Sequence, residues 1–172
     1  MDIHQSSRIL QKKVCILGPS GVGKTSLIKQ YVEGIFSEKY HTSIGVKIDK
    51  KAVSLASDKN VELLIWDLEG IDKYCGFNPR YLRGASGIIL VVDQSRVNSL
   101  AEAKEIYSMM ELDADIPIFL AINKSDLPQA ENWSANLSLL PDNYVTEVFN
   151  TSAKTGQSVD LLFIKMATHM VS

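Results

Sequence analysis

Residues 18–25 have the composition of a loop that binds polyphosphate. They read Gly18-Pro19-Ser20-Gly21-Val22-Gly23-Lys24-Thr25 and fit the pattern G-x-x-x-x-G-K-[ST]. Glycines let a backbone wrap closely around phosphates, while successive amide N–H groups and a helix N-terminus supply partial positive charge. Lys24 is expected to reach the β- and γ-phosphates, and the Thr25 hydroxyl can ligate Mg²⁺. The loop predicts a nucleotide site and leaves adenine and guanine nucleotides open.

A second polar motif, Asn123-Lys124-Ser125-Asp126, directly follows the apolar run Ile116–Ile122. A carboxylate such as that of Asp126 can accept hydrogen bonds from the ring N–H and the exocyclic amine of guanine together. Adenine presents no such pair of donors at that edge. The motif therefore favours a guanine nucleotide and disfavours an ATPase.

The elements that must position these motifs follow from hydrophobic periodicity. The run Lys13–Leu17 predicts a strand directly before the phosphate loop, and residues 24–34 predict a helix directly after it. Continuous apolar runs at Ile88–Val92 and Ile116–Ile122 are typical of central parallel strands with both faces covered. The shorter run Val145–Phe149 predicts a last strand.

An edge hairpin and three more helices complete the pattern. Val46–Ala56 and Val61–Asp67 are joined by the polar residues 57–60, which predicts an antiparallel pair at one sheet edge. Helix-forming residues with apolar spacing predict helices over Ser99–Met110, over Val159–Met170 and, with an acidic first turn at Glu131, over Pro128–Leu140.

Together these elements predict an α/β fold of three layers. We expect a mainly parallel six-stranded sheet with one antiparallel edge hairpin and helices on both faces. Ligands in such sheets bind beyond the C-terminal ends of the strands, where both polar motifs fall. The chain has no internal repeat, linker or low-complexity tract, so residues 1–172 are expected to form one domain.

Composition excludes several classes of function. The 18 Lys and Arg residues against 20 Asp and Glu residues leave a net charge of −2, so we expect no nucleic-acid partner. The two cysteines, Cys15 and Cys75, form no metal-binding pattern, and Cys15 lies in an apolar run that favours a buried, inert thiol. This cysteine usage indicates a reducing, cytoplasmic compartment. No apolar run reaches the roughly 18 residues of a membrane span, and neither terminus carries a lipidation motif, so no direct lipid anchor is expected.

In their order and spacing, the motifs resemble those of the Ras superfamily of small GTPases, from about Lys12 to Met170. The stretch Tyr81–Asp93 is most similar to Rab proteins. The resemblance implies the P-loop NTPase fold of a Ras-like G domain, with GTP or GDP and Mg²⁺ as cofactors. The phosphate-contacting residues that it implies are Ser20, Gly21, Val22, Gly23, Lys24, Thr25 and Ser26.

The resemblance also implies residues around the base. Asn123 would brace the phosphate loop, Lys124 would lie along the base plane and Asp126 would read guanine. Ser152-Ala153-Lys154 matches the loop of the family whose Ala N–H contacts the guanine O6, although a plain polar loop is the alternative. Phe36 occupies the place of an aromatic residue that packs on the base; the alternative is a core residue at the end of a helix.

Two segments match the nucleotide-sensing switches of the family. Asp67-Leu68-Glu69-Gly70 fits D-x-x-G, in which the Asp holds Mg²⁺ through water and the Gly N–H meets the γ-phosphate; an Asp that only caps a turn is the alternative. Upstream, counting from Lys24 places the Mg²⁺-binding hydroxyl of the family on Ser43, with Thr42 one residue out of register. We therefore expect Thr25, Ser43 and Asp67 to hold Mg²⁺, and Lys24, Ser43 and Gly70 to act in hydrolysis.

The second switch departs from the family. The residue after Gly70 is usually a Gln that orients the attacking water, but here it is Ile71, which has no polar side-chain atom. Glu69 replaces a small residue, and its carboxylate would either oppose the γ-phosphate or point to solvent. Slow intrinsic hydrolysis is the expectation.

Two classes of function remain open from the sequence. The first is a Mg²⁺-dependent GTP/GDP switch that contacts effectors, exchange factors or GTPase-activating proteins through residues 36–45 and 68–83. The second is a nearly inert guanine-nucleotide-binding module that presents a fixed surface. Glu69 and Ile71 discriminate between the two, because the binding motifs are common to both.

Overall fold

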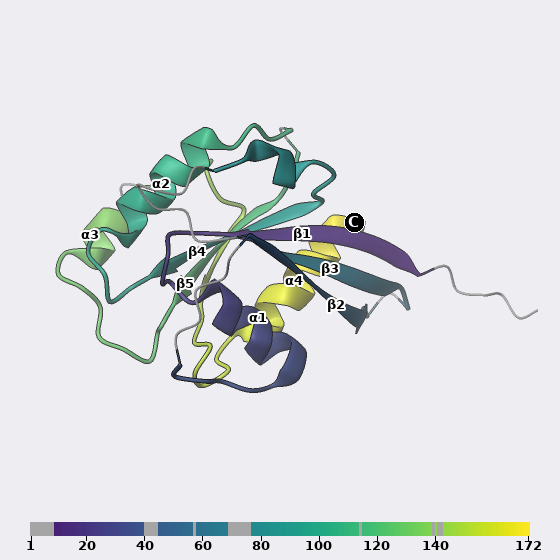
Figure 1. Cartoon of the computed structure of the whole chain (residues 1–172), viewed down its shortest axis with the longest axis horizontal. Coiled ribbons are helices and arrows are strands. Elements are labelled where there is room, and N and C mark those ends of the chain that lie inside the picture. Colours follow the sequence, from purple (N-terminus) through teal and green to yellow (C-terminus); the bar gives the residue numbers. More distant parts are fainter. Residues whose placement is uncertain are drawn as a thin grey trace, which may run out of the picture.

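A six-stranded sheet forms the centre of the computed structural model, which describes residues 9–39, 45–56, 58–68, 77–113, 115–138, 140 and 143–172 (Figure 1). The strands are β1 (Leu10–Leu17), β2 (Val46–Ser54), β3 (Asn60–Leu68), β4 (Gly87–Asp93), β5 (Ile118–Asn123) and β6 (Glu147–Asn150). Their order across the sheet is β2-β3-β1-β4-β5-β6. All neighbours are parallel except β2 and β3, which pair antiparallel at the edge. The predicted fold class and edge hairpin are confirmed.

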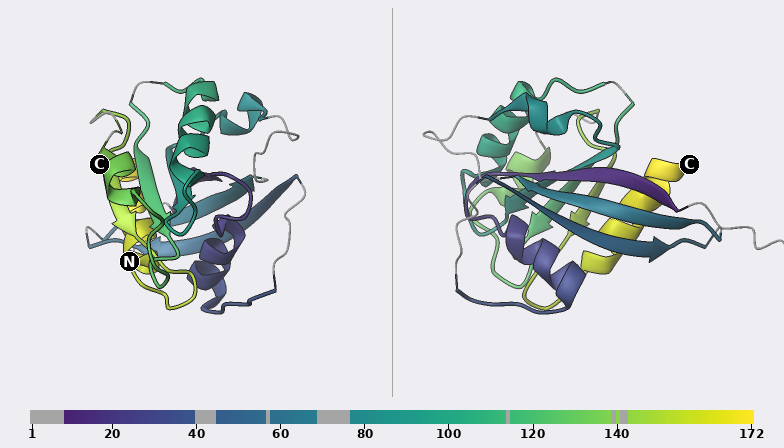
Figure 2. Two further views of the ribbon diagram at one scale, coloured as in Figure 1. Left: turned by 90° about the vertical axis from the view of Figure 1, so that its left-hand side faces the viewer. Right: turned by 45° about the vertical axis from the view of Figure 1, so that its right-hand side comes forward.

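Helices cover both faces of this sheet. They are α1 (Lys24–Glu33), α2 (Ser99–Met109), α3 (Trp133–Ser138) and α4 (Val159–Val171), with a short 3-10 helix at Pro79–Leu82. Figures 1 and 2 show α1 and α4 on one face and α2 and α3 on the other. Each pair of helices closes a separate buried apolar cluster against the sheet. The chain is therefore a three-layer sandwich, as its periodicity predicts.

The helix predicted around Glu131 is much shorter than expected. α3 begins at Trp133, after Asn132 has adopted a left-handed conformation with φ of 59°, and Glu131 lies before the helix and not in its first turn. Trp133 is 2% exposed and packs into the cluster under α2 and α3. Burial of this one indole therefore anchors the helix, because the polar residues around it give little amphipathic pattern.

Strand β1 leads straight into the phosphate loop, and the side chains of its residues 14–17 are buried in the two apolar clusters. Cys15 in this strand is completely buried, as its apolar surroundings predict. Burial raises the pKa of the Cys15 thiol to about 12, which keeps it protonated and unreactive. Within the described residues, no helix is both long enough and apolar enough to cross a membrane.

Candidate nucleotide site

A cavity of about 370 Å³ opens beyond the C-terminal ends of β1 and β5, at the edge of the sheet where the sequence places the polar motifs. Four segments line it: the phosphate loop with the start of α1, the segment after α1, and the loops after β5 and β6. Its lining residues are Ser20, Gly21, Gly23, Lys24, Thr25, Ser26, Lys29, Ile35, Phe36, Ser37, Glu38, Lys39, Asn123, Lys124, Asp126, Leu127, Ala153 and Lys154. Most of the predicted binding residues therefore meet in one cavity, while Val22 and Ser152 are fully buried behind it.

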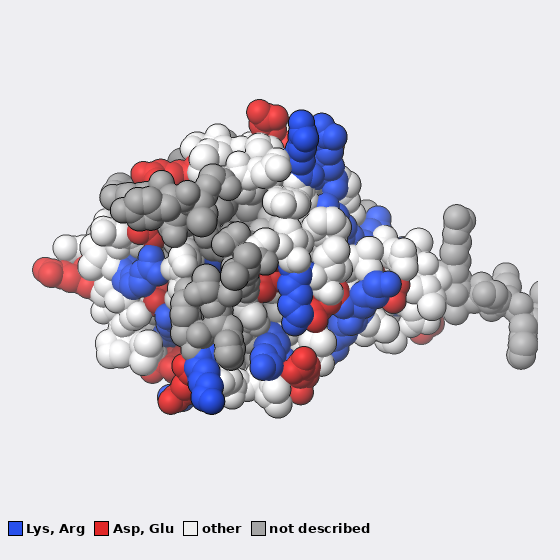
Figure 3. Space-filling model, in the orientation of Figure 1, with Lys and Arg blue, Asp and Glu red and all other residues white. Residues whose placement is uncertain are grey.

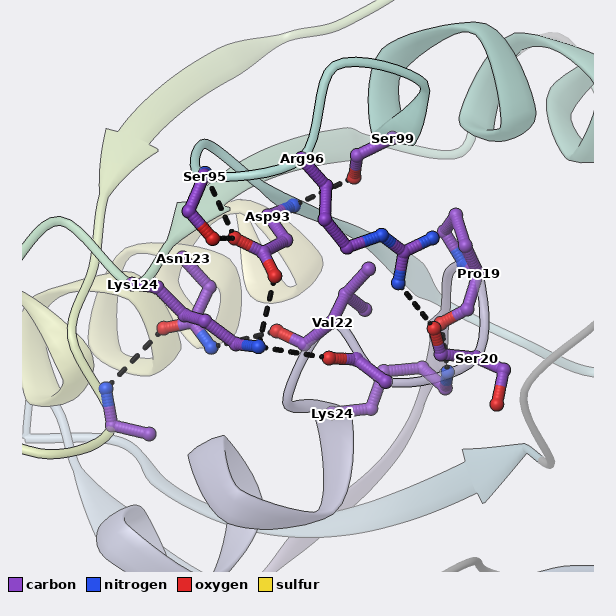
Figure 4. A network of polar contacts seen from close by, with 12 residues as sticks. Pro19, Ser20, Val22, Lys24, Asp93, Ser95, Arg96, Ser99, Asn123 and Lys124 are labelled. Carbon is purple, nitrogen blue, oxygen red and sulfur yellow. Dashed lines mark hydrogen bonds and ion pairs between the residues drawn. The ribbon is translucent and has the colours of Figure 1, made fainter. Parts of the chain in front are cut away.

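Three side chains that are distant from the phosphate loop in the sequence hold successive carbonyls of that loop (Figure 4). The carbonyls of residues 20, 21 and 22 accept hydrogen bonds from Arg96 Nη1 at 2.6 Å, Lys124 Nζ at 3.0 Å and Asn123 Nδ2 at 2.9 Å, respectively. In a planar trans peptide the C=O and the following N–H point in opposite directions. Fixing these carbonyls therefore fixes the directions of the next three amide groups, which is the arrangement an anion-binding loop needs.

Lys24 lies inside this loop with 6% of its surface exposed. Its ammonium donates to the carbonyls of Gly18 and Pro19, each at 2.9 Å. Burial lowers the pKa of Lys24 to about 8, with Asp67 opposing that shift and the charge of Arg96 adding to it. A buried cation of this kind favours a ligand that brings negative charge, such as a phosphate group.

Two glycines allow the loop to approach its supports. A Cβ on Gly23, which has φ of 98°, would collide with the amide nitrogen of Asn123. A Cβ on Gly18 would collide with the carbonyl oxygen of Val91 in β4. The two outer glycines of the motif thus permit direct contact between the loop and the neighbouring strands.

A buried carboxylate that sequence reasoning missed lies behind the loop. Asp93 ends β4 with 1% of its surface exposed, and its Oδ2 is 2.8 Å from the ammonium of Lys124. Its Oδ1 accepts from the backbone N–H and the hydroxyl of Ser95, and its N–H donates to the hydroxyl of Ser99 at 2.7 Å. Asp93 therefore orients Lys124, and the available signal was a carboxylate that terminates an otherwise apolar strand.

The loops after β5 and β6 meet at the other end of the cavity. The hydroxyl of Ser152 donates to Asp126 Oδ1 at 2.7 Å, which orients the carboxylate predicted to read guanine. Asn123 Oδ1 accepts from the backbone N–H of Ala153 and the hydroxyl of Thr151, both at 3.3 Å. One amide side chain thus ties the phosphate loop to both base loops.

The segment after α1 carries two exposed apolar side chains into the cavity. Gly34 ends α1 in a left-handed conformation, and Ile35 and Phe36 follow it with 49% and 38% of their surfaces exposed. Phe36 is therefore not the core residue that a helix end could have supplied. Its ring is available to an apolar ligand face, such as a nucleobase.

Thr25 and Asp67 approach each other at the start of α1. The Thr25 hydroxyl donates to Asp67 Oδ2 at 2.6 Å, and both are oxygen donors of the type that Mg²⁺ prefers. The described residues contain no cluster of three His, Cys, Asp or Glu that could hold a metal without further ligands. Thr42, Ser43, Glu69, Gly70 and Ile71 lie outside the described residues.

Comparisons with known proteins agree with this geometry. A model of the Ras family matches residues 13–172. The chain is also similar to the Ras-related protein Rab-5B of Plasmodium falciparum (isolate 3D7), with 33% identity over 164 residues. That alignment covers 93% of this chain and 78% of the relative. Both matches include the phosphate loop and the loops after β5 and β6.

Proposed function

Because this chain belongs to the Ras family of small GTP-binding proteins and is Rab-like, we propose that its cavity holds GTP or GDP through the residues described above. The observation that carries the proposal is the set of hydrogen bonds that Arg96, Lys124 and Asn123 make to the phosphate loop. These bonds prepare a row of amide groups for phosphates before any ligand arrives. Preorganisation of this kind lowers the cost of binding.

At the phosphate end, the proposed contacts are the amides of residues 20–26 and the ammonium of Lys24. At the base end, Asp126, oriented by Ser152, accepts from the ring N–H and the amine of guanine. The N–H of Ala153 donates to Asn123 Oδ1 at 3.3 Å in this structure, and the base oxygen would replace that long contact. Phe36 covers the base from the side of α1, and Lys124 and Lys154 flank it. This division of roles supports a guanine nucleotide.

Mg²⁺ is proposed to lie beside Thr25 and Asp67, with Ser43 as a further ligand. The contact between Thr25 and Asp67 supports this, because it brings a hydroxyl and a carboxylate together next to the buried Lys24. When bound, the ion supplies charge neutralisation at the phosphates. The ammonium of Lys24 also neutralises charge on the phosphates.

For hydrolysis, we propose a slow GTPase whose rate depends on a partner. Ile71 cannot orient water, so the attacking molecule lacks the usual side-chain support, and Gly70 is left as the backbone sensor of the γ-phosphate. The alternative is a nearly inert module, which Glu69 favours because a carboxylate near the γ-phosphate would oppose its charge. Ser43, Glu69, Gly70 and Ile71 lie outside the described part of the chain, so the proposal for hydrolysis rests on their residue types.

The direct test is to extract nucleotide from freshly purified protein and to follow its identity with time. We expect guanine nucleotide alone, with GTP converting slowly to GDP. Guanine nucleotide that persists as GTP would identify the inert module. Adenine nucleotide in equal amount would contradict the assignment of the site.

A second experiment separates Ile71 from Glu69. Phosphate release in a single turnover at saturating Mg²⁺ should be faster in Ile71→Gln than in the parent, and fastest in the double variant with Glu69→Ala. The two changes should couple because both residues are expected to neighbour one ligand. A brisk parent rate that Ile71→Gln leaves unchanged would show that another group orients the water, with Glu69 as the first candidate.

Effectors, exchange factors and GTPase-activating proteins are the partners of this family, and we propose that they contact residues 36–45 and 68–83 here. Ile48 of β2, 48% exposed, stands opposite Trp66 of β3 between these segments and extends the surface. Basic and acidic side chains are interspersed on the face in Figure 3, which supports a protein partner over a nucleic acid. A single G domain over residues 1–172, acting in the cytoplasm, completes the proposal.

A further inference from the structure

Arg96 spans the gap between the phosphate loop and the first turn of α2. Its Nη1 donates to the carbonyl of Ser20 at 2.6 Å, and its Nη2 donates to Glu102 Oε2 at 2.7 Å (Figure 4 shows the contact with the loop). Each half of the guanidinium thus has a separate acceptor. The planar fork of Arg can satisfy both at once, whereas the single ammonium of Lys cannot do so in the same geometry.

The backbone that carries Arg96 is held in place on both sides. The N–H of Arg96 donates to the carbonyl of Asp93 at 3.1 Å, and its own carbonyl accepts from the N–H of Ser99 at 3.2 Å. Asp93 is in turn bound to Ser95, Ser99 and Lys124 through contacts of 2.6 to 2.9 Å. The side chain therefore extends from a fixed turn and not from a free loop.

The ion pair between Arg96 and Glu102 is partly exposed, with 37% and 43% of the two side chains accessible. A pair in that setting adds little stability to the fold. Its geometric effect is larger, because Glu102 orients the guanidinium so that the other nitrogen faces the loop. Glu102 belongs to α2, so the bridge joins that helix to the phosphate site.

We propose that Arg96, oriented by Glu102, is a positioning residue that holds the Ser20–Gly21 peptide with its N–H toward the phosphates and thereby slows the loss of bound nucleotide. This inference rests on the proposed nucleotide site. Holding the Ser20 carbonyl fixes the direction of the Gly21 N–H, since both belong to one planar peptide. The positive charge of Arg96 also acts at the loop, where it helps to lower the pKa of Lys24.

The test measures the dissociation rate of fluorescent GDP from the full chain in Mg²⁺. Arg96→Ala should release GDP about tenfold faster, the effect expected for loss of one hydrogen bond from a charged group. Arg96→Lys should fall between the parent and Arg96→Ala, and Glu102→Gln should accelerate release by a smaller factor. Lys104→Ala, which removes an exposed cation from α2, is the matched control and should not change the rate of GDP release.

Melting temperatures with and without GDP separate positioning from a purely structural role. Arg96→Ala should reduce the increase in Tm that GDP confers and leave the Tm of the nucleotide-free protein near that of the parent. Equal losses in both states, or a GDP release rate within twofold of the parent, would overturn the inference. A change confined to a GTP analogue would also overturn it, because it would mean that Arg96 reaches the γ-phosphate. A parent protein that binds no GDP would instead refute the proposed function itself.

Discussion

The two ends of the cavity are built from different chemistry. At the phosphate end, charged side chains converge on the backbone, and Lys24 and Asp93 are almost completely buried. At the base end, Asp126 is exposed and is oriented by a neutral hydroxyl from Ser152. The protein itself thus fixes the groups at the phosphate end, while the base end presents one carboxylate with acceptor sites that face the cavity. We infer that the first sets how long a nucleotide stays and the second sets which base is accepted.

The largest loss of nucleotide affinity should come from removing Lys24 at the phosphate end. Lys24→Ala removes the buried cation that we propose to face the β- and γ-phosphates, and we expect GDP affinity to fall by about a hundredfold or more, as for other buried charge partners. Titration calorimetry with GDP measures this loss. Lys165→Ala, an exposed lysine of α4, is the control. Copurification of as much nucleotide with Lys24→Ala as with the parent would remove the loop from the site.

At the base end, Asp126→Asn should change which base is accepted as well as the affinity for GDP. The amide cannot accept from both guanine donors, so GDP affinity should fall by at least about a hundredfold, as for unpaired polar groups in a closed site. Xanthosine diphosphate has a carbonyl acceptor where guanine has its amine and keeps the ring N–H donor, which matches the N–H₂ and C=O of an amide, so it should bind the variant better than GDP. Competition against fluorescent GDP measures both affinities. Parent protein that binds ADP as well as GDP would contradict the role of Asp126.

Removal of Mg²⁺ tests the contact between Thr25 of α1 and Asp67 of β3. If Thr25 and Asp67 help to hold Mg²⁺, chelation by EDTA should accelerate GDP release from the parent by about tenfold. Thr25→Asn should already release GDP quickly and respond much less to EDTA. Stopped-flow fluorescence gives both rates. An equal response of the two proteins to EDTA would place the metal elsewhere.

The smallest effect concerns the strand beneath the phosphate loop. Cys15 is completely buried and burial raises the pKa of its thiol to about 12, so at pH 8 only about one molecule in ten thousand carries the thiolate. In a Cys75→Ser background, an aromatic disulfide should leave Cys15 unmodified whether or not GDP is bound, and should modify it in guanidinium chloride. Rapid modification of the native, nucleotide-free protein would contradict this expectation and show that β1 becomes exposed when nucleotide is lost.

The sequence predicted the parts of the site whose spacing is dictated by the ligand. The phosphate loop, Asn123–Asp126 and Ser152–Lys154 could each be found because strands and glycines bring them to one edge in a fixed order. Arg96 and Asp93 belong to no motif, since their role is to contact the protein and not the ligand. Only the sheet topology, which places β4 between β1 and β5, reveals what they hold.

The fold followed a similar rule. The predicted β2–β3 hairpin and the central parallel strands are confirmed. They could be predicted because apolar runs in the sequence specify them. The prediction of a helix over Pro128–Leu140 with Glu131 in its first turn was wrong in extent, because the buried indole of Trp133 and the left-handed Asn132 decide where α3 begins. Such tertiary contacts leave no periodic signal.

The most direct test of the division between the two ends is the ratio of affinities for GDP and xanthosine diphosphate. It should be measured under one set of conditions for the parent, Arg96→Ala and Asp126→Asn. We predict that Arg96→Ala weakens both ligands by the same factor and leaves the ratio unchanged, whereas Asp126→Asn reverses the ratio. A ratio that shifts in Arg96→Ala, or persists in Asp126→Asn, would contradict the separation of residence time from base identity.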